Sequence, residues 1–391
     1  MRLITKSGSA ADRVLTGLPH GNCTVTLAES ATRLSPSLEP RYYRDPAITE
    51  LEEERIFGRS WQLVSHEAQL PNPGDYVTGR AGSQPVLVLR DEEETLRAFR
   101  NVCRHRGSRL LTGSGQCGKA IRCLYHGWTY RTDGELIGVP EGRSIVGLDK
   151  SELGLFPARV ETMCGLIFVN LDIHAQPLAE QVAGLPERLA PYGIERLQRY
   201  GEWRNTQPAN WKIVIDNYNE GYHVPIAHPG LMRLLDYKRY DVEVHDGWVW
   251  FEAPLRDKPS GNPMERAYQR IVSPMPGLGE GDRRVWRYAM IYPNTTIDLY
   301  PDQVVTWRID ADGPFRARDE AFGYRHPHAG LRTRVAQRVN NRVNTLVGKE
   351  DYDLVENVQA GLETRGFELG PLSHREAAIA WFADRIRADL G

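Results

Sequence analysis

Two short stretches of the chain each place a cysteine close to a histidine. The first, NVCRHRGSRL, holds Cys103 and His105, and the second, RCLYHGW, holds Cys123 and His126. A zinc finger of the Cys₂His₂ type would place its two histidines together, after its two cysteines. A Rieske [2Fe–2S] centre needs two thiolates on one iron and two imidazoles on the other. One pair from each of two loops supplies that set, so the spacing favours a Rieske cluster over a structural zinc ion or four unrelated side chains.

Between the two pairs, Gly113–Gly118 reads GSGQCG and matches the GxGxxG pattern of dinucleotide-binding proteins. That pattern is informative only where it follows a strand and opens a helix, with an acidic residue about 20 positions further on. Here it lies in a turn-rich segment, so we do not interpret it as a nucleotide site. We expect any NAD(P)H to be oxidised by a separate reductase.

A second set of candidate metal ligands lies in NWKIVIDNYNEGYHVPIAHP, residues 210–229. On a helix Glu220 and His223, three residues apart, would share a face. Pro225 cannot continue that helix, so we expect the chain to turn and bring His228 back toward His223. Two histidines and one carboxylate form a facial triad that binds iron and leaves positions open for O₂ and substrate.

The carboxylate of this triad must come from another part of the chain. The stretch KEDYDLVENVQ, residues 349–359, falls in a predicted helix and is rich in acids. Asp351 is our choice, and helix geometry alone does not separate it from Glu350, Asp353 and Glu356. The alternative is a pair of ordinary histidines with satisfied hydrogen bonds.

The elements that must position these residues divide the chain into three parts, and the fold class is predicted as α+β. Short, β-rich runs punctuated by glycine, proline and asparagine indicate an antiparallel β domain that carries both Cys–His loops. Helices and a second antiparallel sheet follow and carry the iron triad. The predicted parts are an N-terminal helical segment packed on the catalytic domain (1–58), the Rieske domain (59–171) and the catalytic domain (172–391).

Within these parts several elements can be assigned by their periodicity. Helical spacing of apolar residues predicts helices over 46–57, 209–223, 331–362 and 373–390. Residues 257–282 are rich in glycine and proline, and we expect them to form a mobile loop.

Composition restricts the function further. The chain has 391 residues, 41% hydrophobic, with a formal net charge of −2, so no general basic surface for nucleic acid is expected. No apolar run approaches the ~20 residues of a membrane helix. The five cysteines are an odd number scattered over a long chain, and no signal peptide is visible, so we expect a cytoplasmic protein.

Taken in chain order, the motifs CRH…CLYHGW, NWK…EGYHxxxxHP and EDxxxxExxQ resemble those of the Rieske non-haem iron oxygenases, terminal oxygenase (alpha) subunit. The resemblance covers nearly the whole chain. It implies that Glu220, three residues before the first iron histidine, bridges the two metal centres. It also implies two cofactors: a [2Fe–2S] cluster on Cys103, His105, Cys123 and His126, and a mononuclear Fe(II) on His223, His228 and Asp351.

The same resemblance implies a head-to-tail homotrimer. In this arrangement His126 of one subunit faces His223 of the next through Glu220, and a carboxylate accepts one hydrogen bond from each imidazole. Electrons would come from a separate NAD(P)H-dependent reductase, directly or through a ferredoxin. The substrates would be O₂ and a small molecule.

The class of small molecule is less constrained by the sequence. Glu220 stands where ring-hydroxylating dioxygenases usually have Asp, which resembles the carnitine and glycine betaine oxygenases. We therefore expect oxidative N-demethylation or C–N cleavage of a quaternary or tertiary amine such as a betaine. The alternatives are aromatic ring hydroxylation and a non-catalytic Rieske electron-transfer protein. Aromatic residues near the second site favour ordinary packing, although a few can form a cage for a quaternary ammonium group; they are Tyr218, Tyr222, Tyr237, Tyr240, Trp248, Trp250 and Phe251.

Overall fold

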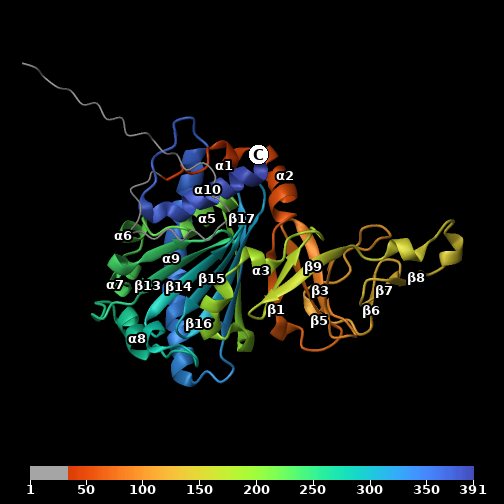
Figure 1. Ribbon diagram of the computed structural model, residues 1–391, viewed down its shortest axis with the longest axis horizontal. Helices are drawn as coiled ribbons and strands as arrows, with labels where there is room; N and C mark the ends of the chain where they lie inside the picture. Colours follow the sequence, from red (N-terminus) through yellow and green to blue (C-terminus); the bar gives the residue numbers. More distant parts are fainter. Residues whose placement is uncertain (1–33) are drawn as a thin grey trace, which may run out of the picture.

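The computed structural model describes residues 34–391 and is built around two seven-stranded antiparallel sheets (Figure 1). The first sheet has the strand order β1-β10-β9-β4-β3-β2-β5, and a three-stranded sheet, β6-β7-β8, extends from it. The strands are β1 Gln62–His66, β2 Asp75–Ala81, β3 Gln84–Arg90, β4 Leu96–Arg100, β5 Ser114–Gln116, β6 Ala120–Arg122, β7 Thr129–Arg131, β8 Leu136–Gly138, β9 Pro157–Met163 and β10 Leu166–Asn170.

The second sheet has the strand order β11-β17-β16-β15-β14-β13-β12, and its neighbours pair in an antiparallel register throughout. This confirms the predicted fold class, α+β with two antiparallel β units. The strands are β11 Gln198–Gln207, β12 Asp241–Val244, β13 Trp248–Pro254, β14 Val285–Ile291, β15 Thr295–Tyr300, β16 Gln303–Ala311 and β17 Ala317–Arg325.

Most of the helices cover one face of this second sheet, while α3 and α4 pack on the other face with Ile297 and Leu299. The α-helices are α1 Arg41–Arg44, α2 Pro46–Glu52, α3 Leu178–Gln181, α4 Leu185–Leu189, α5 Trp211–Tyr218, α6 Val224–Ala227, α7 Pro229–Leu234, α8 Pro263–Ile271, α9 Leu331–Leu362 and α10 Ala377–Leu390. A π-helical turn, Glu53–Phe57, follows α2. Short 3₁₀ segments occupy Glu67–Gln69, Gly142–Ser144, Lys150–Leu153, Ala190–Tyr192, Ile194–Arg196, Tyr237–Arg239, Glu280–Asp282 and His374–Glu376.

The alternation of side chains along β15 shows how the sheet separates two environments. Successive residues of a strand point to opposite faces. Ile297 and Leu299 pack in the cluster that contains Trp61 and Phe168, on the side of the first sheet. Tyr300 instead packs with residues of α7, α8 and α9 on the opposite face. The second face is therefore the one on which the helices enclose a site.

Two helices on this face are tied together at one point. Asn210 precedes α5, and its side chain caps the helix by accepting a hydrogen bond from the Lys212 N–H. Its own backbone N–H donates to Oε1 of Gln359 on α9, at 2.8 Å. Since α5 leads into the segment with the two candidate histidines and α9 carries the candidate carboxylates, this contact fixes the two ligand-bearing elements relative to each other.

The segment before the first sheet packs on the second sheet and its helices. Leu38, Tyr42 and Phe57 share one buried cluster with Trp211 of α5 and Phe382 of α10. Glu52 contributes a buried carboxylate that pairs with Lys212. The N-terminal helical segment is described only from residue 34, and the earlier part of the predicted segment 1–58 lies outside the described residues.

Three secondary-structure predictions need correction. The predicted helix over 209–223 is wrong after Tyr218, because Asn219 and Gly221 are poor helix formers and the Glu220 carboxylate accepts backbone hydrogen bonds from Tyr222 and His223. The predicted helix over 46–57 is α-helical only to Glu52 and continues as a π-turn.

The third correction concerns the predicted loop over 257–282, which contains α8. Asn262 caps this helix and Pro263 occupies its first turn. Glu265 on α8 is buried and pairs with Arg233 of α7, so the helix is anchored to its neighbour.

Within residues 34–391, no helix is long and apolar enough to cross a membrane.

Candidate metal centres

The two Cys–His pairs lie in loops that have the same backbone hydrogen bonds. In each loop the cysteine N–H donates to the carbonyl five residues later, and a glycine four residues after the cysteine donates back to the cysteine carbonyl. Both glycines have a φ of +72°, which a residue with a Cβ rarely adopts. The bonds are Cys103–Ser108, 2.8 Å; Gly107–Cys103, 3.1 Å; Cys123–Trp128, 2.8 Å; and Gly127–Cys123, 2.9 Å.

The cysteines of these loops are buried and face each other. Cys103 and Cys123 are within hydrogen-bonding reach, and the Cys103 sulfur also contacts the Tyr130 hydroxyl at 3.3 Å. Burial raises the pKa of Cys103. Burial acts in the same direction on Cys123, but backbone N–H groups of Tyr125 and His126 and other hydrogen bonds outweigh it and lower the pKa of Cys123. Hydrogen bonds to sulfur are what a cluster held by thiolates requires.

The two histidines of the loops lie side by side at the surface end of this arrangement. The ring centroids of His105 and His126 are 4.6 Å apart, and His105 stacks on Trp128 at 4.8 Å. Among the described residues, no three of the four Cys and His side chains converge within 4.8 Å of one another as around a single ion. A cysteine pair next to a histidine pair therefore fits a binuclear cluster better than one tetrahedral zinc ion, whose ligands surround one point.

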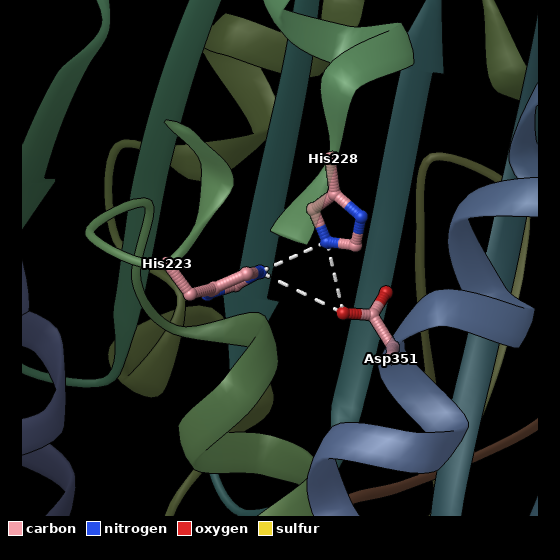
Figure 2. Close-up of side chains that lie close together, drawn as sticks. All are labelled: His223, His228 and Asp351. Carbon is pink, nitrogen blue, oxygen red and sulfur yellow. Dashed lines mark hydrogen bonds and ion pairs between the residues drawn. The ribbon is translucent and has the colours of Figure 1, made fainter. Parts of the chain in front are cut away.

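In the second set of candidate ligands, three side chains converge (Figure 2). Nε2 of His228 lies 3.1 Å from Nε2 of His223 and 3.0 Å from Oδ1 of Asp351. Nε2 of His223 lies 3.6 Å from the same Asp351 oxygen. Ligand atoms about 2.1 Å from a metal and at right angles to one another are about 3 Å apart. The three atoms therefore fit one face of an octahedral metal, which leaves the opposite face for other ligands.

The outer nitrogen of each imidazole is held by a glutamate. Nδ1 of His223 is hydrogen-bonded to Oε1 of Glu220, and Nδ1 of His228 lies 2.7 Å from Oε2 of Glu350. An Nδ1–H that donates to a carboxylate leaves the Nε2 lone pair free for a metal. Burial lowers the pKa of His228, but the bonds to Asp351 and Glu350 outweigh burial and raise it. The same negative surroundings favour a metal cation.

Chain segments far apart in the sequence supply these residues. His223 ends the turn after α5 and is the N-cap residue of α6, and His228 lies between α6 and α7, where Pro229 starts the next helix. Asp351 lies on α9, as the sequence interpretation required. Glu220 contacts His223 as expected, although through a turn rather than across a helix face, and its Oε2 accepts the backbone N–H groups of Tyr222 and His223.

The sequence interpretation named the competitors of Asp351 but missed the position of Glu350. Glu350 contacts the outer nitrogen of His228, while Asp353 and Glu356 are exposed. The available signal was the pair of adjacent acids at 350–351, because consecutive helix residues point in directions about 100° apart and can reach two sides of one ring.

A cavity of about 930 Å³ opens beside the triad. Its wall includes α5, the α6–α7 segment, α9 and the helix-covered face of the second sheet. Of the seven aromatic residues singled out from the sequence, four line this cavity, namely Tyr218, Tyr237, Tyr240 and Phe251. Tyr222 is exposed, and Trp248 and Trp250 pack on the opposite face of the sheet.

Two family models match the chain in adjacent regions. The model of the Rieske [2Fe-2S] domain matches residues 60–152, which include both Cys–His loops. The model of the ring hydroxylating alpha subunit (catalytic domain) matches residues 194–391, which include the triad. Each set of candidate ligands therefore lies within the match of a different family model.

Individual relatives agree with these models. The carnitine monooxygenase oxygenase subunit of Acinetobacter baumannii is 30% identical over 333 residues, which cover 83% of this chain and 85% of that protein. The biphenyl 2,3-dioxygenase subunit alpha of Rhodococcus jostii is 40% identical over 205 residues, 50% of this chain and 44% of that protein. The chain also aligns with a solved structure of a quaternary ammonium Rieske monooxygenase, with a TM-score of 0.80 and 27% identity. The alignment covers 92% of this chain and 96% of that chain. That structure is described as giving insights into carnitine oxidation by gut microbiota and inter-subunit electron transfer.

Proposed function

Because the chain belongs to the Rieske-type ring-hydroxylating oxygenase alpha subunits, we propose that it is the terminal oxygenase for oxidative N-demethylation or C–N cleavage of a quaternary or tertiary amine. The predicted enzyme class, a Rieske non-haem iron oxygenase, and the predicted cofactors, a [2Fe–2S] cluster and a mononuclear iron, are confirmed by the two family matches. We also propose which residues hold these cofactors, which amine class is the substrate and which partners the enzyme needs.

The donor chemistry supports a specific assignment of the ligands. Cys103 and Cys123 would hold one iron of the cluster, and His105 and His126 the other. The triad His223, His228 and Asp351 would hold the mononuclear iron. When bound, the two centres supply electrons and activate O₂ for attack on a C–H bond. The chain's own contribution is to fix the imidazoles through Glu220 and Glu350 and to hold the substrate beside the triad.

The acidic lining of the cavity is the observation that carries the choice of an amine. The acids outnumber the basic residues Arg204 and Lys349, and Arg204 is paired with Glu202 and Glu320. A cavity with this excess of carboxylates attracts a cation and disfavours an anion. The acidic residues that line it are Glu220, Asp236, Asp298, Asp319, Asp351 and Asp353.

A head-to-tail homotrimer is part of the proposal. The loop with Cys123 and His126 joins β6 to β7, at the end of the molecule opposite α6 (Figure 1), which lies between His223 and His228 in the chain. Its tip presents apolar surface, since Leu124 is 91% and Tyr125 is 57% exposed. Such exposed apolar side chains suit burial against another subunit. In the trimer His126 of the partner subunit would lie near Glu220, so that electrons cross between subunits.

A separate reductase completes the proposed system. We propose a NAD(P)H-dependent reductase, with or without a ferredoxin, as the electron donor. We place the enzyme in the cytoplasm, where NAD(P)H is available. The need for two electrons per O₂ activated is the reason for proposing the reductase.

A substrate screen with a surrogate reductase tests the proposal. Hydroxylation of an N-methyl group gives a hemiaminal that releases formaldehyde. We expect trimethylammonium compounds, such as carnitine and glycine betaine, to give formaldehyde or a cleaved amine in step with NADH and O₂ consumption. Formation of a ring-hydroxylated product from biphenyl, with no amine oxidised, would contradict the amine assignment.

Aromatic ring hydroxylation is the second candidate function. The 40% identity with a biphenyl dioxygenase subunit over half of the chain favours it. The acidic cavity lining disfavours it, because a neutral arene gains nothing from the four lining carboxylates that are outside the triad and have no ion pair among the described residues, namely Asp236, Asp298, Asp319 and Asp353. The non-catalytic alternative, a Rieske electron-transfer protein, is excluded by the catalytic-domain match over 194–391.

A further inference from the structure

Asp298 is an acidic residue in the middle of the cavity wall, within the sheet itself. It lies on β15, on the face that the helices cover, and it is only 7% exposed. Three neutral donors hold its carboxylate. The Tyr218 hydroxyl donates to Oδ1 at 2.8 Å, while the Trp307 indole N–H and the Tyr300 hydroxyl donate to Oδ2 at 3.0 and 3.2 Å. These bonds orient the carboxylate but do not neutralise its charge.

Among residues 34–391, no Lys, Arg or His forms an ion pair with Asp298. Two other buried carboxylates of the second sheet and its helices do have a cation, whereas Asp302 and Asp319 resemble Asp298 in having no ion pair within the described residues. Asp310 pairs with Arg308, and Glu265 pairs with Arg233. A buried, unpaired carboxylate is costly, and proteins usually pair or protonate it. Burial raises the pKa of Asp298 to about 6, and the three hydrogen bonds act against this rise, so most of the carboxyl groups are ionised at neutral pH.

Aromatic rings surround this carboxylate on the cavity side. Tyr218 packs edge-to-face with Phe251 and with Tyr288, at centroid distances of 6.1 and 6.3 Å. Tyr288 packs in the same way with Tyr300, at 6.2 Å. All four rings line the cavity. Ring faces attract a cation, and quaternary ammonium ligands are recognised by aromatic walls of this kind.

We propose that Asp298, with the rings of Tyr218, Tyr288 and Phe251, is the subsite that binds the positively charged nitrogen of the substrate. The inference rests on the proposed function for the identity of the cavity as the substrate site. It adds the residue that discriminates a cation from a neutral molecule of the same shape. A quaternary ammonium group has no N–H to donate, so a buried carboxylate and ring faces are the groups that can stabilise it.

Asp319 is the best competitor and serves as the matched control. It also lines the cavity, is buried, and has a pKa that burial raises to about 6. Its Oδ2 accepts from the Gln207 amide at 2.6 Å, and its Oδ1 has no partner among the described residues. Within residues 34–391 no aromatic side chain donates a hydrogen bond to it, in contrast to the three that hold Asp298. It lies on β17, two strands away from β15.

The test compares choline with its neutral isostere 3,3-dimethylbutan-1-ol, in which carbon replaces the charged nitrogen. Binding to the iron-loaded holoenzyme is measured by calorimetry, in the absence of reductase. We expect the wild-type protein to bind choline more tightly than the isostere by about tenfold. Asp298→Asn should remove most of this preference by weakening choline binding alone, since only the ring faces remain, while Asp319→Asn should keep it. Tyr288→Leu, which leaves the carboxylate in place, should reduce it.

The possible results separate three assignments: the subsite at Asp298, the competing carboxylate Asp319 and the proposed reaction. If Asp298→Asn keeps the preference for choline, or weakens both ligands equally, the subsite assignment is wrong. If Asp319→Asn removes the preference and Asp298→Asn does not, the cation binds at the competing carboxylate. If Asp298→Asn does not fold, the Tyr288→Leu result decides in the same way. If Asp298→Asn removes the preference for choline but no amine is oxidised in the substrate screen, the subsite assignment is supported and the proposed reaction is wrong.

Discussion

Glu350 holds the imidazole of His228 from the side opposite the triad, with its Oε2 2.7 Å from Nδ1. The next residue of α9, Asp351, reaches the other nitrogen of the same ring at 3.0 Å. The ring is therefore fixed between two consecutive side chains of one helix. Such an arrangement sets both the orientation and the tautomer of a metal-binding histidine.

We predict that Glu350→Ala weakens the mononuclear iron site without affecting the cluster. Loss of a carboxylate behind a metal-binding histidine typically lowers metal affinity by about 10- to 100-fold. Titration of the iron-depleted protein with Fe(II) measures the affinity, and the visible spectrum reports the cluster. Glu356→Ala, an exposed acid on the same helix, is the control and should bind Fe(II) as the wild type does. Equal affinity in the Glu350 and Glu356 variants would show that the contact is incidental.

Asp351 and Asp353 provide a second test on the same helix. Asp351→Ala should empty the mononuclear site, since its Oδ1 faces both Nε2 atoms. Asp353 is exposed, and Asp353→Ala should retain the iron. Iron per subunit is measured by elemental analysis, with the cluster spectrum as the reference for folding. If only the Asp353 variant loses the mononuclear iron, the assignment of Asp351 as the ligand is wrong and Asp353 takes its place.

Cys123→Ser should remove the cluster and its brown colour. Cys123 is buried against Cys103 in the loop between β6 and β7. Cys164, at the turn between β9 and β10, is the control because its thiol has no part in either loop, and burial raises its pKa to about 11. The measurement is visible absorption together with iron and acid-labile sulfide. Zinc in the purified wild-type protein, with no visible absorption, would exclude the Rieske assignment.

The sequence motifs predicted side chains that the structure brings together at both candidate centres, but not all of their contacts. The spacing of Cys103, His105, Cys123 and His126 was informative because each pair comes from one short loop, where local backbone geometry fixes the side chains. The triad was harder, because α9 approaches His228 from more than 120 positions away in the chain, and helix periodicity alone places four acids within reach. The family resemblance selected Asp351.

The error over residues 219–223 has a physical cause that periodicity does not contain. The apolar spacing of Ile213, Val214 and Tyr218 continues toward Tyr222, so a longer helix was predicted. The chain instead stops the helix with Asn219 and Gly221, and Glu220 satisfies the freed N–H groups of the turn. In the same way α8 lies in a glycine- and proline-rich segment, and it forms because Asn262 and Pro263 start the helix locally.

Glu220→Gln tests the proposed electron path between subunits. Glutamine keeps the size of the side chain but replaces one acceptor oxygen by a donor amide, so it can bond at most one of two imidazole N–H groups without conflict. We expect both metal sites to stay filled and product formation to fall by about 10- to 100-fold. The measurement is single-turnover oxidation of the reduced cluster, with iron content as the control. Near wild-type turnover would leave Glu220 only its local role of holding the turn and His223.

The last prediction concerns the pH dependence of stability at Asp298. Its pKa rises from 3.8 to about 6 on folding because of burial. Between these values the folded protein binds more protons than the unfolded chain, so stability falls as pH rises through the window and levels off above about pH 6. The total contribution is roughly 3 kcal/mol, from about 1.4 kcal/mol per pH unit. The groups that face the carboxyl group, Tyr218, Tyr288, Tyr300 and Trp307, do not titrate in this range.

Asp298→Asn cannot lose a proton, so its stability should lack this contribution. We therefore expect the melting temperature of the variant, minus that of the wild type, to increase between about pH 4 and 6 and to stay constant above. Other buried acids with raised pKa values, such as Asp216, Asp302 and Asp319, are present in both proteins and cancel in the difference. Choline added above pH 7 should stabilise the wild type more than the variant, because it supplies the missing cation. A difference that is independent of pH would show that folding does not shift the pKa of Asp298. A difference that keeps increasing above pH 6 would show that Asp298 stays protonated inside the folded protein, and the cation subsite would lose its charge.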